Sequence, residues 1–461
     1  MPPTQPTRKR LGAWYTPPEL IDIVVDGLLA QDDLSVGPSN GRPIRVLDPA
    51  CGDGRFLLAV ADRLHALDRS VELLGCDIDQ GALDQVTDPR VRLIHADALT
   101  HDWGRERFDI VVGNPPFLSQ MAAETTRGGS SRHGGGPYAD AAVEFMALAV
   151  RLAEPQGGRV ALVLPQSILA ARDGRPVRDS VAQQADLEWS WWEPRQQHFD
   201  ASVNVCVLGL RRPATGATSA STWTRVVTDR LGIPALDQNT LETNGTLGDR
   251  AELNVNFRDE YYALVPAVSD DADGPPLITS GLIDPGLCNW GNQPVRFAKQ
   301  RFEHPRVDLS KLTGRFPAWA ARKLVPKVLV ANQTRILEAV ADPEGAWLPG
   351  VPVTTVTPSE TLVAVPATVW ELAAVLTSPV ASVLAWHSAG GTGMSTTSIR
   401  VGPAVLAATP WPADPIGAAV DALRKGDVTA CAMAITRAYG IGQPSADRLV
   451  TWWSERPARS A

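Results

Sequence analysis

An Asn-Pro-Pro-Phe run at positions 114–117 holds the residues best suited to chemistry, and it directly follows the apolar segment 108–112. An Asn side-chain oxygen and a Pro carbonyl can both accept hydrogen bonds from a single NH2 group. Two prolines also make the turn rigid and donate no backbone hydrogen bonds of their own. The aromatic ring that follows can stack on the base carrying the amine. The run therefore predicts a holder for a planar amino group rather than a simple turn.

A glycine-rich turn precedes this run in the chain. Residues 46–56 read Val-Leu-Asp-Pro-Ala-Cys-Gly-Asp-Gly-Arg-Phe, which is an apolar strand pattern, a tight turn and the start of a helix pattern. Glycines let the backbone approach a ligand, and the helix N-terminus offers free N–H groups to an acceptor. No Gly-Lys-Ser/Thr sequence follows, which excludes a phosphate-binding P-loop. The alternative is a strand–helix turn that binds nothing.

Two acidic residues end the next apolar segments. Asp77 follows the segment 72–76, and Asp97 follows the segment 91–94. An acid about 20–30 residues after a glycine-rich turn can accept hydrogen bonds from both hydroxyls of a ribose. Asp97 could bond the adenine amine of the same ligand, although a helix cap is the alternative. Together these positions predict an adenosine cofactor.

The elements that must position these residues alternate along the chain. Strand patterns occur at 44–47, 72–76, 91–94, 108–112 and 158–164, and helix patterns at 19–29, 55–66 and 139–152. Such alternation predicts an α/β fold whose parallel sheet is covered on both faces. The final segments, 187–192 and 203–210, lie close together in sequence, so we expect a hairpin that adds an antiparallel edge.

Length and composition suggest more than one domain. The chain has 461 residues, of which 44% are hydrophobic and 20% charged, so it is globular rather than disordered. Residues 213–221 are rich in Pro, Ala, Thr and Ser and are interpreted as a linker. The strand–helix alternation is lost beyond it. We therefore predict a catalytic domain at 1–212 and a second domain of mixed α/β structure at 222–461.

The location and metal content are also constrained. Five scattered cysteines include no Cys-x-x-Cys pair, which argues against disulfides and zinc fingers, and we expect no metal. No apolar run reaches the roughly 18 residues that a membrane span needs. The sequence Trp-Tyr-Thr-Pro-Pro stands at 14–18, where a signal peptide would need an apolar core. These observations predict a cytoplasmic protein.

Positive charge is concentrated in one stretch, although the net charge is −8. Residues 288–338 contain ten Lys or Arg against three Asp or Glu, interleaved with Phe297, Phe302, Phe316 and Trp319. A local basic surface lets an acidic protein dock on nucleic acid, whereas the alternative is a solvated surface around core aromatics. The cations that we select as candidate DNA contacts are Arg296, Lys299, Arg301, Arg315, Arg322 and Lys323.

The combined motifs resemble those of S-adenosylmethionine-dependent DNA N6-adenine methyltransferases of the gamma arrangement. Residues 48–54 are similar to their motif I, Asp77 to motif II, Asp97 to motif III and residues 114–117 to motif IV. The segment 12–17 is similar to motif X, which in that family closes over the methionine end of the cofactor. The resemblance implies cofactor contacts from Tyr15, Thr16, Pro17, Asp48, Ala50, Cys51, Gly52, Gly54, Phe56, Asp77, Ile78, Asp97, Ala98 and Asn114. It assigns the catalytic site to Asn114, Pro115, Pro116 and Phe117, and the contacts to a flipped adenine to Phe117 and Phe199.

This resemblance implies a class I, Rossmann-like methyltransferase sheet and a C-terminal target-recognition domain. We expect S-adenosylmethionine as cofactor and a flipped-out adenine of double-stranded DNA as substrate. RNA and protein-glutamine methyltransferases share the Asn-Pro-Pro-aromatic run and remain the alternative, as does a DNA-binding subunit without activity. For Phe199, a core position is the alternative. No lysine follows an acid at the spacing of restriction nucleases, so we expect any endonuclease or other defence protein to be a separate partner.

Overall fold

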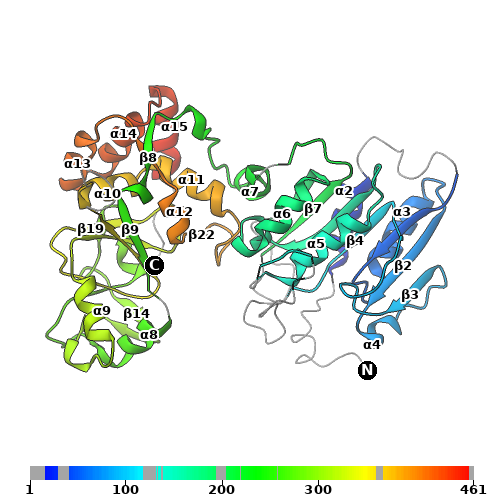
Figure 1. Cartoon of the computed structure of the whole chain (residues 1–461), viewed down its shortest axis with the longest axis horizontal. Helices are drawn as coiled ribbons and strands as arrows, with labels where there is room; N and C mark the ends of the chain where they lie inside the picture. The colour runs from blue at the N-terminus through cyan, green and yellow to red at the C-terminus, as the bar shows by residue number, and fades with distance from the viewer. Residues whose placement is uncertain are drawn as a thin grey trace. The chain divides into compact units, whose positions relative to one another are not determined.

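The computed structural model describes residues 16–29, 41–117, 131, 133–136, 139–193, 204–218, 220–256, 258–359 and 367–455. The chain divides into two compact units, Met1–Arg230 and Leu231–Ala461. Figure 1 shows a layered sheet-and-helix unit in blue to green and a second unit in green to red. The division lies beyond the segment 213–221 that the sequence suggested as a linker.

The first unit is built on a seven-stranded sheet with the order β3-β2-β1-β4-β5-β7-β6. The strands β1 to β5 are parallel, and β7 runs antiparallel to both β5 and β6. The parallel strands are β1 (Ile44–Asp48), β2 (Val71–Asp77), β3 (Val91–His95), β4 (Ile110–Gly113) and β5 (Arg159–Pro165), and the hairpin is β6 (Asp186–Trp191) with β7 (Val205–Arg211). This confirms the α/β prediction and the antiparallel edge.

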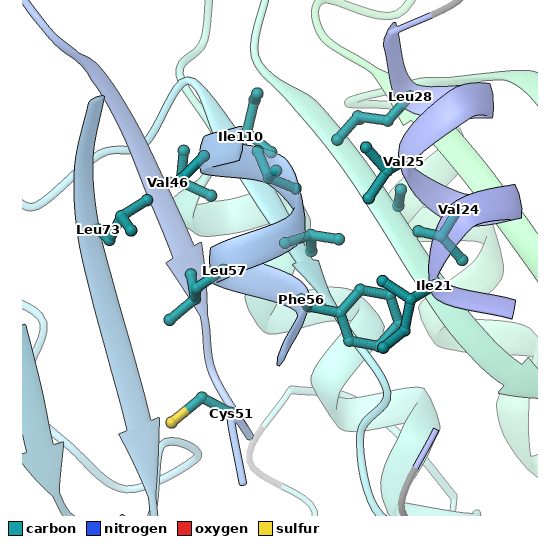
Figure 2. Close-up of a cluster of buried hydrophobic side chains, with 14 of the residues drawn as sticks. Ile21, Val24, Val25, Leu28, Val46, Cys51, Phe56, Leu57, Leu73 and Ile110 are labelled. Carbon is teal, nitrogen blue, oxygen red and sulfur yellow. The ribbon is translucent and has the colours of Figure 1, made fainter. Parts of the chain in front are cut away.

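The inner strands of this sheet are buried on both sides because helices cover both of its faces. The helices are α2 (Pro18–Leu29), α3 (Arg55–His65), α4 (Gln80–Leu83), α5 (Ala141–Leu152), α6 (Arg175–Ala182) and α7 (Ala220–Thr228). On one face, side chains of α2 and α3 join Val46, Leu73 and Ile110 in one core cluster, shown in Figure 2. The alternate strand residues Leu47 and Val111 are also fully buried and point to the opposite face, where α5 packs on β4 and β5.

The segment that follows β7 is tied to the first unit. Asp186, at the start of β6, accepts hydrogen bonds from the backbone N–H groups of Thr215 (2.5 Å), Ala217 (3.1 Å) and Thr218 (3.4 Å). The Thr218 hydroxyl oxygen in turn accepts from the Leu187 N–H at 2.6 Å. Beyond it, α7 packs against β6 and buries Trp223. A buried carboxylate therefore fixes the stretch whose composition suggested a linker.

The second unit combines a small antiparallel sheet with helices. Its main sheet has the order β19-β17-β21-β9, from β9 (Ala251–Val255), β17 (Lys327–Ala331), β19 (Ala339–Asp342) and β21 (Val353–Pro358). The helices are α8 (Arg258–Leu264), α9 (Phe316–Lys323), α10 (Val369–Leu376), α11 (Pro379–Ala389), α12 (Pro403–Ala407), α13 (Gly417–Arg424), α14 (Val428–Ala438) and α15 (Gln443–Ser454). Short strand pairs complete it: β8 (Thr243–Thr246) with β23 (Pro410–Pro412), β10 (Val268–Ser269) with β16 (Arg306–Val307), β11 (Leu277–Ile278) with β20 (Leu348–Pro349), β12 (Ile283–Asp284) with β13 (Leu287–Cys288), β14 (Val295–Phe297) with β15 (Gln300–Phe302), and β18 (Gln333–Thr334) with β22 (Ile399–Arg400).

Within the described ranges, no single helix is long and apolar enough to cross a membrane. The helices α10 and α11 meet the length and composition test only as a pair, with a bend of 61° between them. Both are largely buried in the second unit.

Candidate active site

The glycine-rich turn joins β1 to α3 and presents backbone N–H groups at the carboxyl edge of the sheet. Gly52 and Gly54 adopt positive φ angles of 52° and 78°, which glycine tolerates far better than other residues. A Cβ added at Gly52 would meet no atom within 4 Å, so the space in front of this turn is open. The turn is held to β2 by a hydrogen bond from the Cys51 N–H to the Cys76 carbonyl at 2.9 Å. This is the geometry expected of a loop that a ligand approaches closely.

Asp77 links the first two strands of the site. One carboxylate oxygen accepts from the Gly52 N–H at 2.8 Å, and the other accepts from the Asp79 N–H at 2.8 Å. The side chain that the sequence assigned to ribose binding thus also holds the glycine turn in place. Burial raises the pKa of Asp77 above its usual range, with the nearby Asp79 adding to the effect.

Asn114 follows β4 and meets the segment before α2. Its side-chain nitrogen donates a hydrogen bond to the Thr16 hydroxyl oxygen at 3.0 Å. In this orientation, the amide oxygen is the end that can accept from an incoming amine. Residues 16 and 114 belong to two motifs that are far apart in the sequence, and the structure brings them into direct contact.

A pocket joins the three motifs on the first unit. Its walls are formed by Thr16, by the β1–α3 turn and by Asn114 after β4. Its lining residues are Thr16, Asp48, Ala50, Cys51, Gly52, Asp53, Arg55, Phe56 and Asn114. Most of these are predicted cofactor contacts. Figure 2 shows two of these lining residues: Cys51, just beyond the end of β1, and Phe56, which points from α3 toward Ile21 of α2.

Two lining residues, Asp53 and Arg55, were not predicted as contacts. They form an ion pair at 2.8 Å, in which the Asp53 side chain is 15% exposed. They alternate with the glycines of the turn, and this position in the glycine-rich run is the sequence signal that could have identified them.

The electrostatics of the pocket are dominated by acidic groups. Burial raises the pKa of Asp48 to about 8, and the charges of Asp77 and Asp53 add to this effect, whereas a hydrogen bond from the Ala50 N–H opposes it. The Asp48 carboxyl is packed tightly, since a Cβ at Gly113 would lie 2.5 Å from its oxygen. Burial and the neighbouring acids also raise the pKa of the Cys51 thiol, so it stays protonated. A pocket of this kind favours a cationic ligand over an anion.

The other predicted residues are distributed around the same edge. Asp97 caps its own turn by accepting from the Leu99 N–H at 3.0 Å, which agrees with the alternative of a local cap. Ile78 is 59% exposed at the end of β2, which is unusual for a large apolar side chain. Phe117 is half-buried and packs against the core cluster of the first unit. The remaining predicted positions in the described part are Pro17, Ala98, Pro115 and Pro116, whereas Tyr15 and Phe199 lie outside the described residues.

The candidate DNA contacts have different surroundings. Arg296, Lys299 and Arg301 are exposed on the hairpin of β14 and β15, and Arg322 is exposed on α9. Arg315 pairs with Asp259 at 2.7 Å, whereas the half-buried Lys323 donates to the Thr355 hydroxyl at 3.0 Å. Phe297, Phe302 and Trp319 belong to a core cluster against which Phe316 packs. This burial agrees with the alternative of cations around core aromatics, and the DNA contacts themselves stay a prediction.

Among the described residues, no group of three or more His, Cys, Asp or Glu side chains could hold a metal ion.

The sheet order, with its antiparallel seventh strand, and the glycine turn at the carboxyl edge define a class I methyltransferase fold. Residues 4–223 match the family model described as N-6 DNA Methylase. The matched residues make up just under half of the chain.

Two curated relatives are similar over part of the chain. A Type II methyltransferase of Thermus thermophilus is 30% identical over 207 residues, covering 41% of this chain and 42% of the relative. The Type II methyltransferase M.BanIII of Aneurinibacillus aneurinilyticus is 26% identical over 204 residues, covering 39% of this chain and 35% of the relative. The chain thus spans less than half the length of these relatives.

Solved structures with similarity include methyltransferase proteins of type I restriction systems. The type I methyltransferase subunit from Streptococcus thermophilus has a TM-score of 0.36 at 19% identity, covering 44% of this chain and 45% of that one. The EcoKI M protein has a TM-score of 0.34 at 22% identity, with coverages of 44% and 45%. The fold assignment rests on the sheet order and not on these scores.

The residues present fit S-adenosylmethionine as the cofactor of this family. The open space before Gly52 leaves room for a ligand against the turn. The acidic lining from Asp48 and Asp53 suits a molecule that carries an ammonium and a sulfonium charge. Asp77, at the end of β2, stands where an acid in such folds meets a ribose.

Proposed function

We propose that this protein transfers a methyl group from S-adenosylmethionine to the exocyclic N6 amine of an adenine in double-stranded DNA. The observation that carries the proposal is the contact between Thr16 and Asn114 at the pocket formed by the glycine turn. This contact supports the proposal because Asn114, which we propose to bind the amine, lines the same pocket as Asp48 and Asp53. The match of residues 4–223 to the N-6 DNA methylase family supports the same reaction.

Asn114 and Pro115 would act on the target amine. The lone pair of an exocyclic adenine nitrogen is conjugated with the ring, so this nitrogen is a poor nucleophile. Acceptance of its two hydrogens by the Asn114 side-chain oxygen and the Pro115 carbonyl would favour a more tetrahedral nitrogen with an available lone pair. The same acceptors would stabilise the positive charge that develops on the nitrogen. The cofactor supplies an already activated methyl group, so positioning accounts for most of the catalysis.

The other site residues have supporting roles in this proposal. Asp77 would bind the ribose, Asp97 and Ile78 the adenine ring of the cofactor, and Asp48 its charged methionine end. Because the amine is inaccessible inside a duplex, the adenine must leave the stack. Phe117 and Phe199 would then contact the flipped base. Pro116 would keep the turn between Pro115 and Phe117 rigid.

The direct test uses purified protein, unmethylated duplex DNA and S-adenosylmethionine with a labelled methyl group. We expect label in DNA, recovered as N6-methyl-2′-deoxyadenosine after digestion to nucleosides, and none with an Asn114→Ala variant. Parallel reactions with RNA and with a protein carrying a Gly-Gly-Gln sequence test the alternative substrates. Label in either of those, with none in DNA, would refute the proposed substrate.

We further propose that the second unit supplies target recognition through the β14–β15 hairpin. Arg296 and Arg301 stand directly opposite each other in the register, and Lys299 lies in the turn between the strands with a positive φ of 66°. Like charges directly opposite each other on a hairpin are destabilising. Of these three cations, only Arg301 has an acidic partner among the described residues, and it pairs with Glu303 at 3.2 Å. An anionic ligand would relieve the repulsion, and a two-stranded ribbon fits the major groove of DNA.

A salt titration tests the hairpin against other cations of the same unit. The variant Arg296→Gln/Lys299→Gln/Arg301→Gln should bind every duplex more weakly. Each phosphate contact removed should lower the slope of log affinity against log salt by about 0.9. A control variant that neutralises the exposed Lys425, Arg437 and Arg448 removes the same number of charges. Equal slopes for the two variants would move the DNA-binding surface away from the hairpin.

We place the protein in the cytoplasm, where it would reach chromosomal DNA. A separate restriction endonuclease or another defence protein is the partner that we propose for it. Coexpression of this chain with genes adjacent to its own, followed by affinity purification, would identify such a partner.

A further inference from the structure

We propose that Glu144 is a positioning residue for methyl transfer, because its buried carboxylate holds residues 131 and 133–136 at the sheet edge from which Asn114 extends. The inference rests on the proposed function. It concerns a residue that none of the sequence motifs contains.

Glu144 is a buried acid in an otherwise apolar helix. It lies in the first turn of α5 and is 2% exposed, whereas the other buried residues of this helix are apolar. A buried charge is costly unless it is hydrogen-bonded. Its carboxylate accepts from the Ser131 hydroxyl (3.0 Å), the His133 N–H (2.6 Å) and the Gly135 N–H (2.8 Å). The donors all come from the segment before the helix.

The glycines of this segment fit closely around two acidic side chains. A Cβ added at Gly135 would overlap a Glu144 oxygen, and one at Gly136 would lie 2.5 Å from an Asp173 oxygen. The Gly136 N–H also donates to the Asp173 carbonyl at 2.7 Å. Residues 127–137 are rich in Gly and Ser, a composition typical of a mobile loop. The described residues 133–136 within this stretch are held by the hydrogen bonds given above.

The anchored segment lies at the edge of the sheet that carries the site. Asn114 directly follows β4, which pairs in parallel with β5. The segment is attached on one side to the first turn of α5 and on the other to residue 173, which follows the end of β5. A helix that connects two parallel strands begins at their carboxyl edge. The anchor therefore holds residues 131 and 133–136 at the same carboxyl edge of the sheet from which Asn114 extends.

A matched pair of variants separates positioning from stability. Glu144→Gln keeps the size of the side chain but removes the charge and one of its two acceptor oxygens. Asp186→Asn makes the same change in a second buried carboxylate that holds a loop through backbone N–H groups. In the sheet register, Asp186 of β6 stands opposite Arg211 of β7, and Arg211 stands opposite Arg159 at the start of β5. Asp186 therefore lies at the far edge of the sheet from Asn114.

The measurements are single-turnover methyl transfer to DNA, cofactor affinity, thermal stability and amide hydrogen exchange. For Glu144→Gln we expect faster exchange at residues 133–136, unchanged cofactor affinity and a transfer rate lowered by about 10-fold to 100-fold, since small displacements of reacting groups have effects of this size. For Asp186→Asn we expect a comparable loss of stability with a transfer rate within about twofold of the parent.

Equal rates for Glu144→Gln and the parent would overturn the proposal, as would equal losses of rate in the two variants. If Glu144→Gln does not fold, two other variants test the anchor. Ser131→Ala removes one hydrogen-bond donor, and Gly135→Ala adds a methyl group that displaces the Glu144 carboxylate. A parental rate in both of these variants would also overturn it. The parent protein is assayed first, so a failure of the proposed function appears as no transfer to DNA by the parent, whereas hydrogen exchange still reports the anchor.

Discussion

Binding of the cofactor should release a proton from Asp48. This carboxyl is 1% exposed, and burial together with the charges of Asp77 and Asp53 raises its pKa to about 8. At pH 7 most molecules of the ligand-free protein therefore carry a proton there. A ligand with ammonium and sulfonium charges favours the ionised carboxylate. The protein must lose that proton in order to bind the cofactor at full strength.

The size of the effect follows from the position of this pKa. Below pH 8, affinity should rise with pH by at most about tenfold per unit, since a tenfold change corresponds to one proton released per molecule bound. Between pH 6 and pH 8 the affinity should then rise by up to about 50-fold, and it should level off above pH 8. Asp48→Asn should remove most of this dependence. At pH 9 it should bind about 10-fold to 100-fold more weakly, because hydrogen bonds to charged groups are worth about 1.5–3 kcal/mol.

The assay is calorimetric titration of the ligand-free protein with S-adenosylmethionine at several pH values. Titrations in two buffers with different ionisation enthalpies give the number of protons released. The quantity to compare is the difference in proton release between the parent and Asp48→Asn, because burial also raises the pKa of Asp77 and that group can release protons too. Proton release that is the same in both proteins, or a parental affinity that does not change between pH 6 and pH 8, would refute the reasoning.

Other predictions concern both units. Asn114→Ala should keep cofactor affinity but lower methyl transfer by about 10²–10³-fold in a single-turnover assay, and an unchanged rate would remove Asn114 from the catalytic site. Asp77→Ala should weaken cofactor binding by at least about tenfold in the same calorimetric titration. The substitution removes the carboxylate that would accept from the ligand and that accepts from the Gly52 N–H in the glycine turn, and unchanged affinity would contradict this. The raised pKa of Asp48 means that the ligand-free folded state binds a proton more tightly than the unfolded state, so its contribution to stability is complete below about pH 4 and is lost as pH rises through about 8. Denaturation should therefore show that Asp48→Asn gains stability over the parent as pH rises from 5 to 8, and a constant difference would contradict it. Lys327→Met should lower the free energy of unfolding by about 3–5 kcal/mol, because it leaves Asp342 charged in the core of the second unit, and a loss below about 1 kcal/mol would be inconsistent with a buried pair.

The parallel sheet could be predicted closely from the sequence. The strand β5 is buried on both faces, and its sequence is a continuous apolar run from Val160 to Leu164. The helix over residues 55–65 begins after two glycines whose positive φ angles stop the strand from continuing. Burial, turn chemistry and period all indicated the same structure in this half of the chain, and for that reason the prediction succeeded.

Contacts between segments that are distant in sequence could not be predicted. Nothing in the local pattern indicates that Thr16 accepts a hydrogen bond from Asn114, because this depends on how α2 docks on the sheet. Glu144 was hidden for a related reason, since a helix with one acid among apolar residues normally turns that acid toward solvent. In the second unit the strands are short and pair over long sequence distances, as β9 does with β21. Local patterns carry little information about such pairings.

The distribution of charge in the two units connects these observations. The pocket in the first unit is lined by Asp48 and Asp53, and it would attract a small cation once Asp48 has lost its proton. A protein with a net charge of −8 has no general attraction for DNA and would need a local source of positive potential to bind it. The proposed DNA-binding hairpin of β14 and β15 would supply one in the other unit, on residues whose mutual repulsion is unfavourable until an anion binds. Under this proposal, acidic groups at the pocket and cations on the hairpin would allow one chain to bind a cationic cofactor and a polyanionic substrate without placing their opposing electrostatic demands on the same surface.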